Sequence, residues 1–76
     1  MGYVHLVLLN DYEQAITYFD KALEVKPDYF EALYNKGYCL ELLGEYQVAA
    51  DLYNEVLSIE VNYQKAIDGL NRIHGR

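Results

Sequence analysis

Apolar side chains recur at steps of three and four residues along most of this 76-residue chain, which is the spacing of amphipathic helices. One such run follows Asp11, which has the spacing of a capping box with Gln14, and it stops at Pro27. Its apolar positions are Ala15, Ile16, Phe19, Ala22, Leu23 and Val25. The pattern predicts a helix from about Asp11 to just before Pro27, with charged and polar residues on its exposed side.

Two further helices are predicted on either side of a tight turn at Gly44. Asp28 and Glu31 form a second capping-box pair, which predicts a helix from about Asp28 to Leu43. After the turn, a helix to about Glu60 is predicted by the apolar residues Tyr46, Ala49, Tyr53, Val56, Leu57 and Ile59. Together these segments form a helix hairpin, and Gly37 marks a place where bulk does not fit.

The two ends of the chain differ in pattern. Residues 1–9 are apolar on nearly every side, and such a helix has to be covered all round. We expect a short first helix there, ended by a turn at Asn10-Asp11, where Asn tolerates the left-handed conformation. The last segment, Tyr63 to His74, is apolar on one side only, which is typical of a helix that caps a repeat array.

The junction before this last segment has two interpretations. Val61 stands where Pro27 stood, so no proline prevents the helix from continuing through Asn62. A fused helix could not pack its end on its own chain and would swap it onto another. Alternatively, Asn62 caps a new helix, and the return of an Asn-Tyr-x-x-Ala pattern favours this turn.

The whole pattern repeats at an offset of 34 residues. The matching positions are Asp11-Tyr12 with Glu45-Tyr46, Ala15 with Ala49, Phe19 with Tyr53, Ala22-Leu23 with Val56-Leu57, Val25 with Ile59, and Asp28-Tyr29 with Asn62-Tyr63. A fixed period of this length indicates stacked helical repeats.

These residues resemble the tetratricopeptide repeat family. Its small, turn, aromatic and aliphatic positions are matched by Gly37, Gly44, Tyr46, Ala49, Tyr53 and Leu57, and one period earlier by Tyr12, Ala15, Phe19, Ala22 and Pro27. The resemblance covers Asp11 to about Ile73. It implies antiparallel helix pairs stacked into a right-handed superhelix, whose inner face usually binds peptides or partner proteins.

We therefore expect one all-α domain over residues 1–76, with five helices and about two repeats. Residues 1–27 form a truncated first repeat, residues 28–61 a second repeat, and residues 62–76 a capping helix. Tyr3 takes the position of Gly37 one repeat earlier, where two helices come close. A tyrosine there should push the first hairpin open or send its first helix elsewhere.

By analogy with the family, the inner face carries Glu31 and the candidate partner-binding residues. These are Tyr34, Tyr38, Glu41 and Leu42, flanked by Lys65 and Arg72. Two tyrosines four residues apart lie one above the other on a helix and offer apolar area with a polar tip, which suits peptide recognition. The alternative is that they only pack against neighbouring helices. The family's chaperone-tail clamp is excluded, because Tyr34, Tyr38 and Asp68 stand where it needs basic or amide residues.

Charge and composition narrow the classes of partner and chemistry. Six Lys and Arg against twelve Asp and Glu give a net charge of -6, which repels nucleic acid. The single Cys39 fits a reducing compartment and, most simply, a buried small side chain. No His, Cys or carboxylate spacing predicts a metal site, a cofactor or an enzyme. The apolar run at the amino end is too short to span a bilayer, so we expect a cytoplasmic protein that does not use the membrane.

The predicted function is a non-catalytic protein-interaction module. The alternative is structural: the same chain assembles into a homo-oligomer, most simply a two-fold dimer, through Val4, Leu6, Val7 and Leu8. Covering each such side chain is worth roughly 1.5 to 3 kcal/mol, whereas a core of this size supplies only about 3 to 5 kcal/mol of net stability. A third interpretation is that the chain is a fragment of a longer array whose other repeats supply these contacts.

Overall fold

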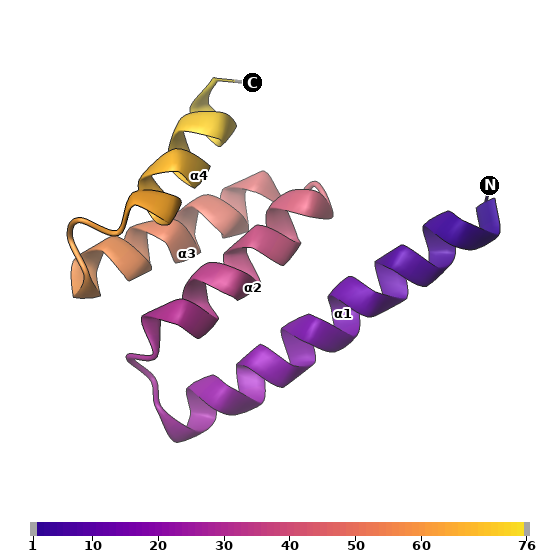
Figure 1. The fold of residues 1–76 in the computed structure, drawn as a ribbon, viewed down its shortest axis with the longest axis horizontal. Helices are drawn as coiled ribbons and strands as arrows, with labels where there is room; N and C mark the ends of the chain where they lie inside the picture. The colour runs from indigo at the N-terminus through magenta and orange to yellow at the C-terminus, as the bar shows by residue number, and fades with distance from the viewer. Residues whose placement is uncertain (1, 76) are drawn as a thin grey trace.

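A computed structural model describes the backbone of residues 2–75 and the side chains of residues 11–75. Over this range the protein is all-α, with four helices in the order α1 (Gly2–Val25), α2 (Phe30–Leu42), α3 (Tyr46–Ile59) and α4 (Gln64–His74). Figure 1 shows α2 lying between α1 and α3, with α4 against α3 at the carboxyl end. The all-α prediction is confirmed, and the superhelix stays a prediction.

The expected turn at Asn10-Asp11 was wrong, because α1 runs through both residues without a break. Four helices therefore replace the five expected. The turn between α2 and α3 shows what is missing at Asn10: Gly44 adopts a φ of +88°, and no other described residue has a positive φ. Position 10 is Asn and not Gly, so a turn like the one at Gly44 would need a left-handed backbone that glycine adopts much more readily.

The expected capping boxes do not form. Asp11 lies inside α1, so there is no helix start for it to cap. The residue that precedes α2 is Tyr29, and no described side chain caps this end. Its carbonyl oxygen instead accepts hydrogen bonds from the Ala32 and Leu33 N–H groups, both at 3.1 Å. The backbone carbonyl thus closes the first turn of α2, which leaves the Asp28 side chain unused at this helix end.

A turn, and not a fused helix, separates α3 from α4. Glu60 has an extended backbone, and the Tyr63 N–H donates to the Glu60 carbonyl at 3.2 Å. The loop before α2 has the same form, with the Tyr29 N–H donating to the Lys26 carbonyl at 3.1 Å. Proline at the second position is therefore compatible with this turn but not required for it. No described side chain caps α4, so the predicted capping role of Asn62 was wrong.

The core is centred on Tyr53 of α3. Tyr53, Val56, Ala49 and Ala66 are fully buried, and Leu33 completes the cluster. A Cβ placed on Gly37 would lie 3.0 Å from the Tyr53 ring, and one placed on Gly69 would lie 2.5 Å from it. These two glycines let α2 and α4 approach the same ring from two sides, so α2 and α4 also contact each other. This contact creates the face that carries the candidate site.

Candidate functional site

The candidate site lies where α2 and α4 meet. We call it the α2–α4 face, and it consists of Tyr34, Tyr38, Leu42, Lys65 and Arg72. Tyr38 is 41% exposed and Leu42 is 47% exposed, although both are large apolar side chains. They are four residues apart on α2 and therefore lie on one side of the helix. The face thus presents a continuous apolar strip with basic side chains at one edge.

The two tyrosines of the face differ in their surroundings. The rings of Tyr34 and Tyr38 stack, with centroids 6.1 Å apart and an interplanar angle of 16°. Tyr34 also meets the rings of Tyr53 and Tyr63, each at 5.7 Å, and is only partly exposed. Tyr34 therefore packs between helices, as the alternative interpretation has it, while Tyr38 presents its ring to the outside.

Glu41 lies beneath the face and is only 4% exposed. Its Oε2 accepts a hydrogen bond from Arg72 Nε at 2.9 Å, and its Oε1 accepts one from Arg72 Nη2 at 3.0 Å. The Tyr53 hydroxyl also donates to Oε1, at 2.7 Å. A buried carboxylate needs such partners, and this one ties α2, α3 and α4 together. Glu41 therefore positions other residues of the face and contributes little surface of its own.

Arg72 is held in place from two sides. Besides its paired hydrogen bonds to Glu41, its guanidinium lies over the Tyr38 ring at 5.8 Å from the centroid. The side chain is nevertheless 43% exposed. Arg72 thus carries a fixed and still accessible positive group at the edge of the apolar strip, and it limits the movement of the Tyr38 ring.

The pKa values of this cluster follow from its hydrogen bonds and burial. The hydrogen bond to Glu41 raises the pKa of Arg72, so the guanidinium stays charged. Burial, and then the hydrogen bond to Glu41, raise the pKa of the Tyr53 hydroxyl. Burial also raises the pKa of Tyr34, although the nearby positive charges of Arg72 and Lys65 offset part of this. The cluster therefore consists of neutral tyrosines around one compensated ion pair.

The other candidate residues lie elsewhere. Glu31 is exposed in the first turn of α2. Cys39 is buried, and burial raises the pKa of its thiol, which disfavours a reactive thiolate. The side chains of Val4, Leu6, Val7 and Leu8 lie outside the described ones. No structural role was predicted for Gly69, although a glycine inside a predicted helix often marks a place where another element packs closely against that helix.

Several kinds of site are absent from the described residues. They contain no cluster of His, Cys, Asp or Glu that could hold a metal ion, and they enclose no pocket. Among the described helices, none combines the length and the apolar character needed to cross a bilayer. The α2–α4 face is therefore an open surface and not a cleft.

A tetratricopeptide repeat family model matches residues 5–69. The chain belongs to the tetratricopeptide repeat family. The paired helices, the buried Tyr53 and the glycine turn at Gly44 agree with the resemblance drawn from the sequence.

Three relatives are between 28% and 40% identical to this chain. It is 40% identical to an uncharacterised protein of Methanocaldococcus jannaschii over 67% of the chain and 59% of the relative. It is 35% identical to the uncharacterised protein ycf37 of Guillardia theta over 90% of the chain and 38% of that protein. It is 28% identical to the photosystem I assembly protein Ycf3 of Acaryochloris marina over 88% of the chain and 49% of that protein. The chain thus spans from under two fifths to about three fifths of these relatives.

Proposed function

We propose that this chain is a non-catalytic protein-interaction module that binds a peptide or a partner protein through the α2–α4 face. One observation carries the proposal: Tyr38 and Leu42 are 41% and 47% exposed on one side of α2, beside an arginine that the buried Glu41 holds in place. The family supports an interaction role. So does the similarity to a relative named as a photosystem I assembly protein.

The geometry suits binding because the face is already ordered. The Tyr38 ring stacks on the Tyr34 ring and also contacts the Arg72 guanidinium, so a ligand need not restrict it much further. Leu42 extends the apolar strip by one helical turn, and Lys65 and Arg72 can each meet a carboxylate. The face therefore fits a peptide with apolar side chains and an acidic residue at one end.

The proposal is tested by selecting short peptides from a random phage-displayed library against the protein. Selected peptides are synthesised, and their dissociation constants are measured for Tyr38→Ala and Leu42→Ala. Each variant should weaken binding by about tenfold or more, as for a residue at the centre of an interface. The matched control is Tyr18→Ala, because Tyr18 is 70% exposed on α1. Equal losses for Tyr18→Ala and Tyr38→Ala, or no selectable peptide, would contradict the proposal.

Self-assembly is the second candidate function. The observation that favours it is that α1 is unbroken: residues 2–10 and residues 11–25 form one continuous helix. In Figure 1 the amino-terminal part of α1 extends away from the other helices. Val4, Leu6, Val7 and Leu8 belong to this part, and their role in self-association stays a prediction. The third candidate is that the chain forms part of a longer array of repeats. We also propose a cytoplasmic location.

A further inference from the structure

Equivalent helices of the two repeats are not equally covered. In α3, three core residues are fully buried: Ala49, Tyr53 and Val56. The residues 34 positions earlier in α1 are only partly buried: Ala15, Phe19 and Ala22. Helix α3 packs against both α2 and α4, whereas α1 packs against α2 alone among the described helices. One side of α1 is therefore uncovered.

The contacts between α2 and α3 show which side of α1 this is. A Cβ on Gly37 of α2 would lie 3.0 Å from Cε1 of Tyr53 and 3.3 Å from Cβ of Leu52. These two residues therefore mark the side of α3 that meets α2. Their equivalents on α1 are Tyr18 and Phe19, so the side that carries Tyr18 and Phe19 is the one that an equivalent helix would cover.

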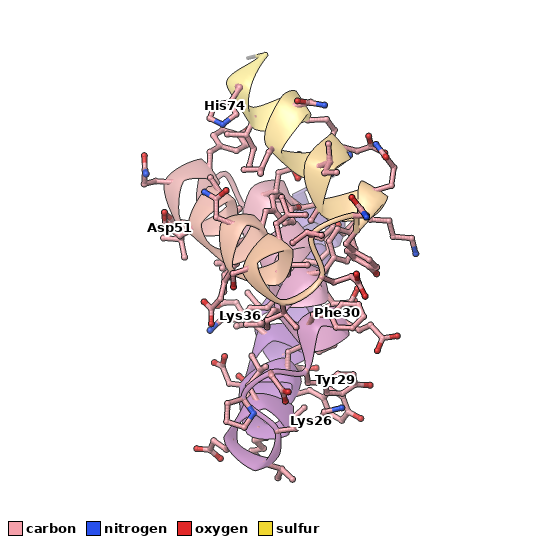
Figure 2. All side chains as sticks on the ribbon, turned by 90° about the vertical axis from the view of Figure 1, so that its left-hand side faces the viewer. Lys26, Tyr29, Phe30, Lys36, Asp51 and His74 are labelled. Atoms are coloured by element: carbon pink, nitrogen blue, oxygen red, sulfur yellow. The ribbon has the colours of Figure 1, made fainter. Side chains whose placement is uncertain are left out.

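Helix α2 does not cover this side of α1. It meets α1 where Lys36 reaches across from α2 and forms an ion pair with Asp20 at 2.6 Å (Figure 2). Successive residues of a helix point about 100° apart, so Tyr18 and Asp20 point about 160° apart. Tyr18 thus lies nearly opposite the contact with α2, and it is 70% exposed.

Four uncharged residues form the open side, which we call the α1 strip: Ala15, Tyr18, Phe19 and Ala22. Their spacing of three and four residues places them on one side of the helix. One helical turn beyond the two ends of the strip lie Asp11 and Lys26. Lys26 is exposed, and its Nζ lies 5.4 Å from the centroid of the Tyr29 ring (Figure 2). The strip is therefore uncharged along its length, with one acidic and one basic end.

We propose that the α1 strip binds an amphipathic helix of another protein, which lies antiparallel to α1 and places a glycine against Phe19. The α2–α3 hairpin provides the template, because α2 covers the equivalent side of α3 in this way, with Gly37 against Tyr53. Tyr18 is larger than Leu52, its equivalent in α3. A partner helix therefore needs a glycine here at least as much as α2 does.

The charges at the ends of the strip indicate the charges of the partner. An antiparallel helix begins beside Lys26 and ends beside Asp11. Its first turn should be acidic and its last turn basic, which is also the arrangement that the helix dipole favours. In α3 the position equivalent to Lys26 is Glu60. The preference for an acidic first turn is therefore particular to the α1 strip.

A second copy of this chain does not supply such a helix. Inside its described helices, Gly37 and Gly69 both already lie against the Tyr53 ring. Its other glycines begin a helix, form the turn or follow the last helix: Gly2, Gly44 and Gly75. Two copies also repel, because each has a net charge of -6. The occupant is therefore a helix of a different protein. The strip shares no residue with the α2–α4 face, so this inference does not rest on the peptide-binding proposal.

The probe is a synthetic peptide with the sequence of residues 28–43, which contains the required glycine and an acidic first turn. It carries Cys39→Ser to prevent oxidation and Glu41→Lys to make its last turn basic. The second change also disfavours exchange with the chain's own α2, where Glu41 binds Arg72 and Tyr53. The peptide should therefore bind the α1 strip and not displace α2.

Fluorescence anisotropy of the labelled peptide measures binding. The unaltered protein should bind it in a saturable manner. A second peptide that also carries Gly37→Leu should bind at least about tenfold more weakly, because the larger side chain meets Phe19. No binding of the first peptide, or equal affinities for the two peptides, would overturn the proposal.

Two variants of the protein locate the bound peptide. Tyr18→Glu adds a charge to the strip, and Thr17→Glu adds the same charge to the adjacent residue, which points away from the strip. Both residues are exposed, so circular dichroism should show unchanged helix content. Tyr18→Glu should weaken binding by at least about tenfold and Thr17→Glu by less than about twofold. Equal effects of the two variants would overturn the proposal.

Two further measurements exclude other sites and other occupants. Tyr38→Ala alters the α2–α4 face and should leave the affinity for the probe unchanged. A loss equal to that of Tyr18→Glu would place the probe on the α2–α4 face and overturn the inference. Light scattering without the probe should give the same mass for the unaltered protein and Tyr18→Glu. A dimer that Tyr18→Glu dissociates would show that a second copy covers the strip, which would also overturn the inference.

Discussion

At the scale of single residues, Tyr53 is held in a socket whose two walls are glycines. The Cβ of an alanine at position 69 would lie 2.5 Å from Cε2 and 2.7 Å from Cζ of the ring, whereas one at position 37 would lie 3.0 Å from Cε1. The ring is fully buried and its hydroxyl is bonded to Glu41, so it cannot move aside freely. The fit on the α4 side is therefore tighter than the fit on the α2 side.

We expect Gly69→Ala to lower the free energy of unfolding by about 1 to 3 kcal/mol, the usual cost of overpacking. Alanine gains about 1 kcal/mol in helix propensity over glycine, but the clash with a fixed ring outweighs this gain. Gly37→Ala should cost less, because its contacts are longer. Urea denaturation followed by circular dichroism measures both variants. A smaller loss for Gly69→Ala than for Gly37→Ala would contradict the geometry of the socket.

The Glu41–Arg72 pair should show strong coupling in a double-mutant cycle. Arg72→Met removes the guanidinium that compensates the buried Glu41 carboxylate, and we expect the free energy of unfolding to fall by about 2 to 4 kcal/mol. Glu41→Gln still accepts from Tyr53 but loses the charge. The double variant should be less destabilised than the sum of the single variants by at least about 1 kcal/mol. Additive losses would show that the pair is not coupled.

The sequence predicted the residues of this cluster but not their arrangement. Tyr34, Tyr38 and Arg72 follow from helical periodicity and the family pattern. Glu41 was assigned to the same surface by analogy with the family, yet it is only 4% exposed. Periodicity gives the side of a helix and not the depth of the contact, and depth depends on α4, which begins over twenty residues later. Gly69 lets α4 approach Tyr53, and the approach of α4 brings Arg72 within hydrogen-bond distance of Glu41.

At the scale of elements, the α1–α2 loop and the α3–α4 loop have the same shape but different sequences. Pro27 and Val61 occupy the same position in turns closed by hydrogen bonds at 3.1 and 3.2 Å. Val61 is 67% exposed. Glu60 before it is extended, with φ of −127° and ψ of 92°, so it lies outside the helical region that a following proline disfavours.

Val61→Pro should therefore raise the free energy of unfolding by about 0.4 to 1 kcal/mol, because it restricts the unfolded chain without disturbing the turn. The matched control is Asn62→Pro, one position later, where proline would disfavour the helical conformation of the residue before it. This control should destabilise the protein. The urea midpoints of the two variants provide the comparison, and a midpoint for Val61→Pro below that of the unaltered protein would contradict the equivalence of the loops.

Element boundaries show where sequence reasoning stops. The ends of α2 and α3, the turn at Gly44 and the turn after α3 are close to prediction, because proline, glycine and the repeat pattern mark them. The missing break in α1 was not predicted, since Asn10-Asp11 resembles a turn as much as it resembles the inside of a helix. The residues at Asn10-Asp11 fit either structure, so the local sequence alone does not decide between a turn and a continuous helix.

At the scale of the whole molecule, the stability of the fold should depend on alkaline pH through Tyr53. Its pKa in the folded protein is raised above the usual 10.0 by burial and then by the hydrogen bond to Glu41. The unfolded chain therefore loses this proton at lower pH than the folded protein does. The stability is fully present below about pH 10 and falls as the pH rises above it, by about 1.4 kcal/mol per pH unit for each such group. Tyr34 adds to the fall, because its pKa is also raised.

Because Tyr53 contacts α2 and α4 as well as belonging to α3, its ionisation should unfold the domain as one unit. Guanidinium unfolding measured between pH 8 and pH 11 should show midpoints that fall with pH and coincide for the circular dichroism of the helices and the near-ultraviolet signal of the tyrosines. Tyr53→Phe should be less stable at pH 8, because the hydrogen bond to Glu41 is lost, and should show a shallower alkaline decline. Tyr18→Phe, with an exposed ring, should keep the full decline. If Tyr53→Phe declined as steeply as Tyr18→Phe, the alkaline sensitivity would not come from the buried hydroxyl, and the central position given to Tyr53 in the stability of this repeat would be wrong.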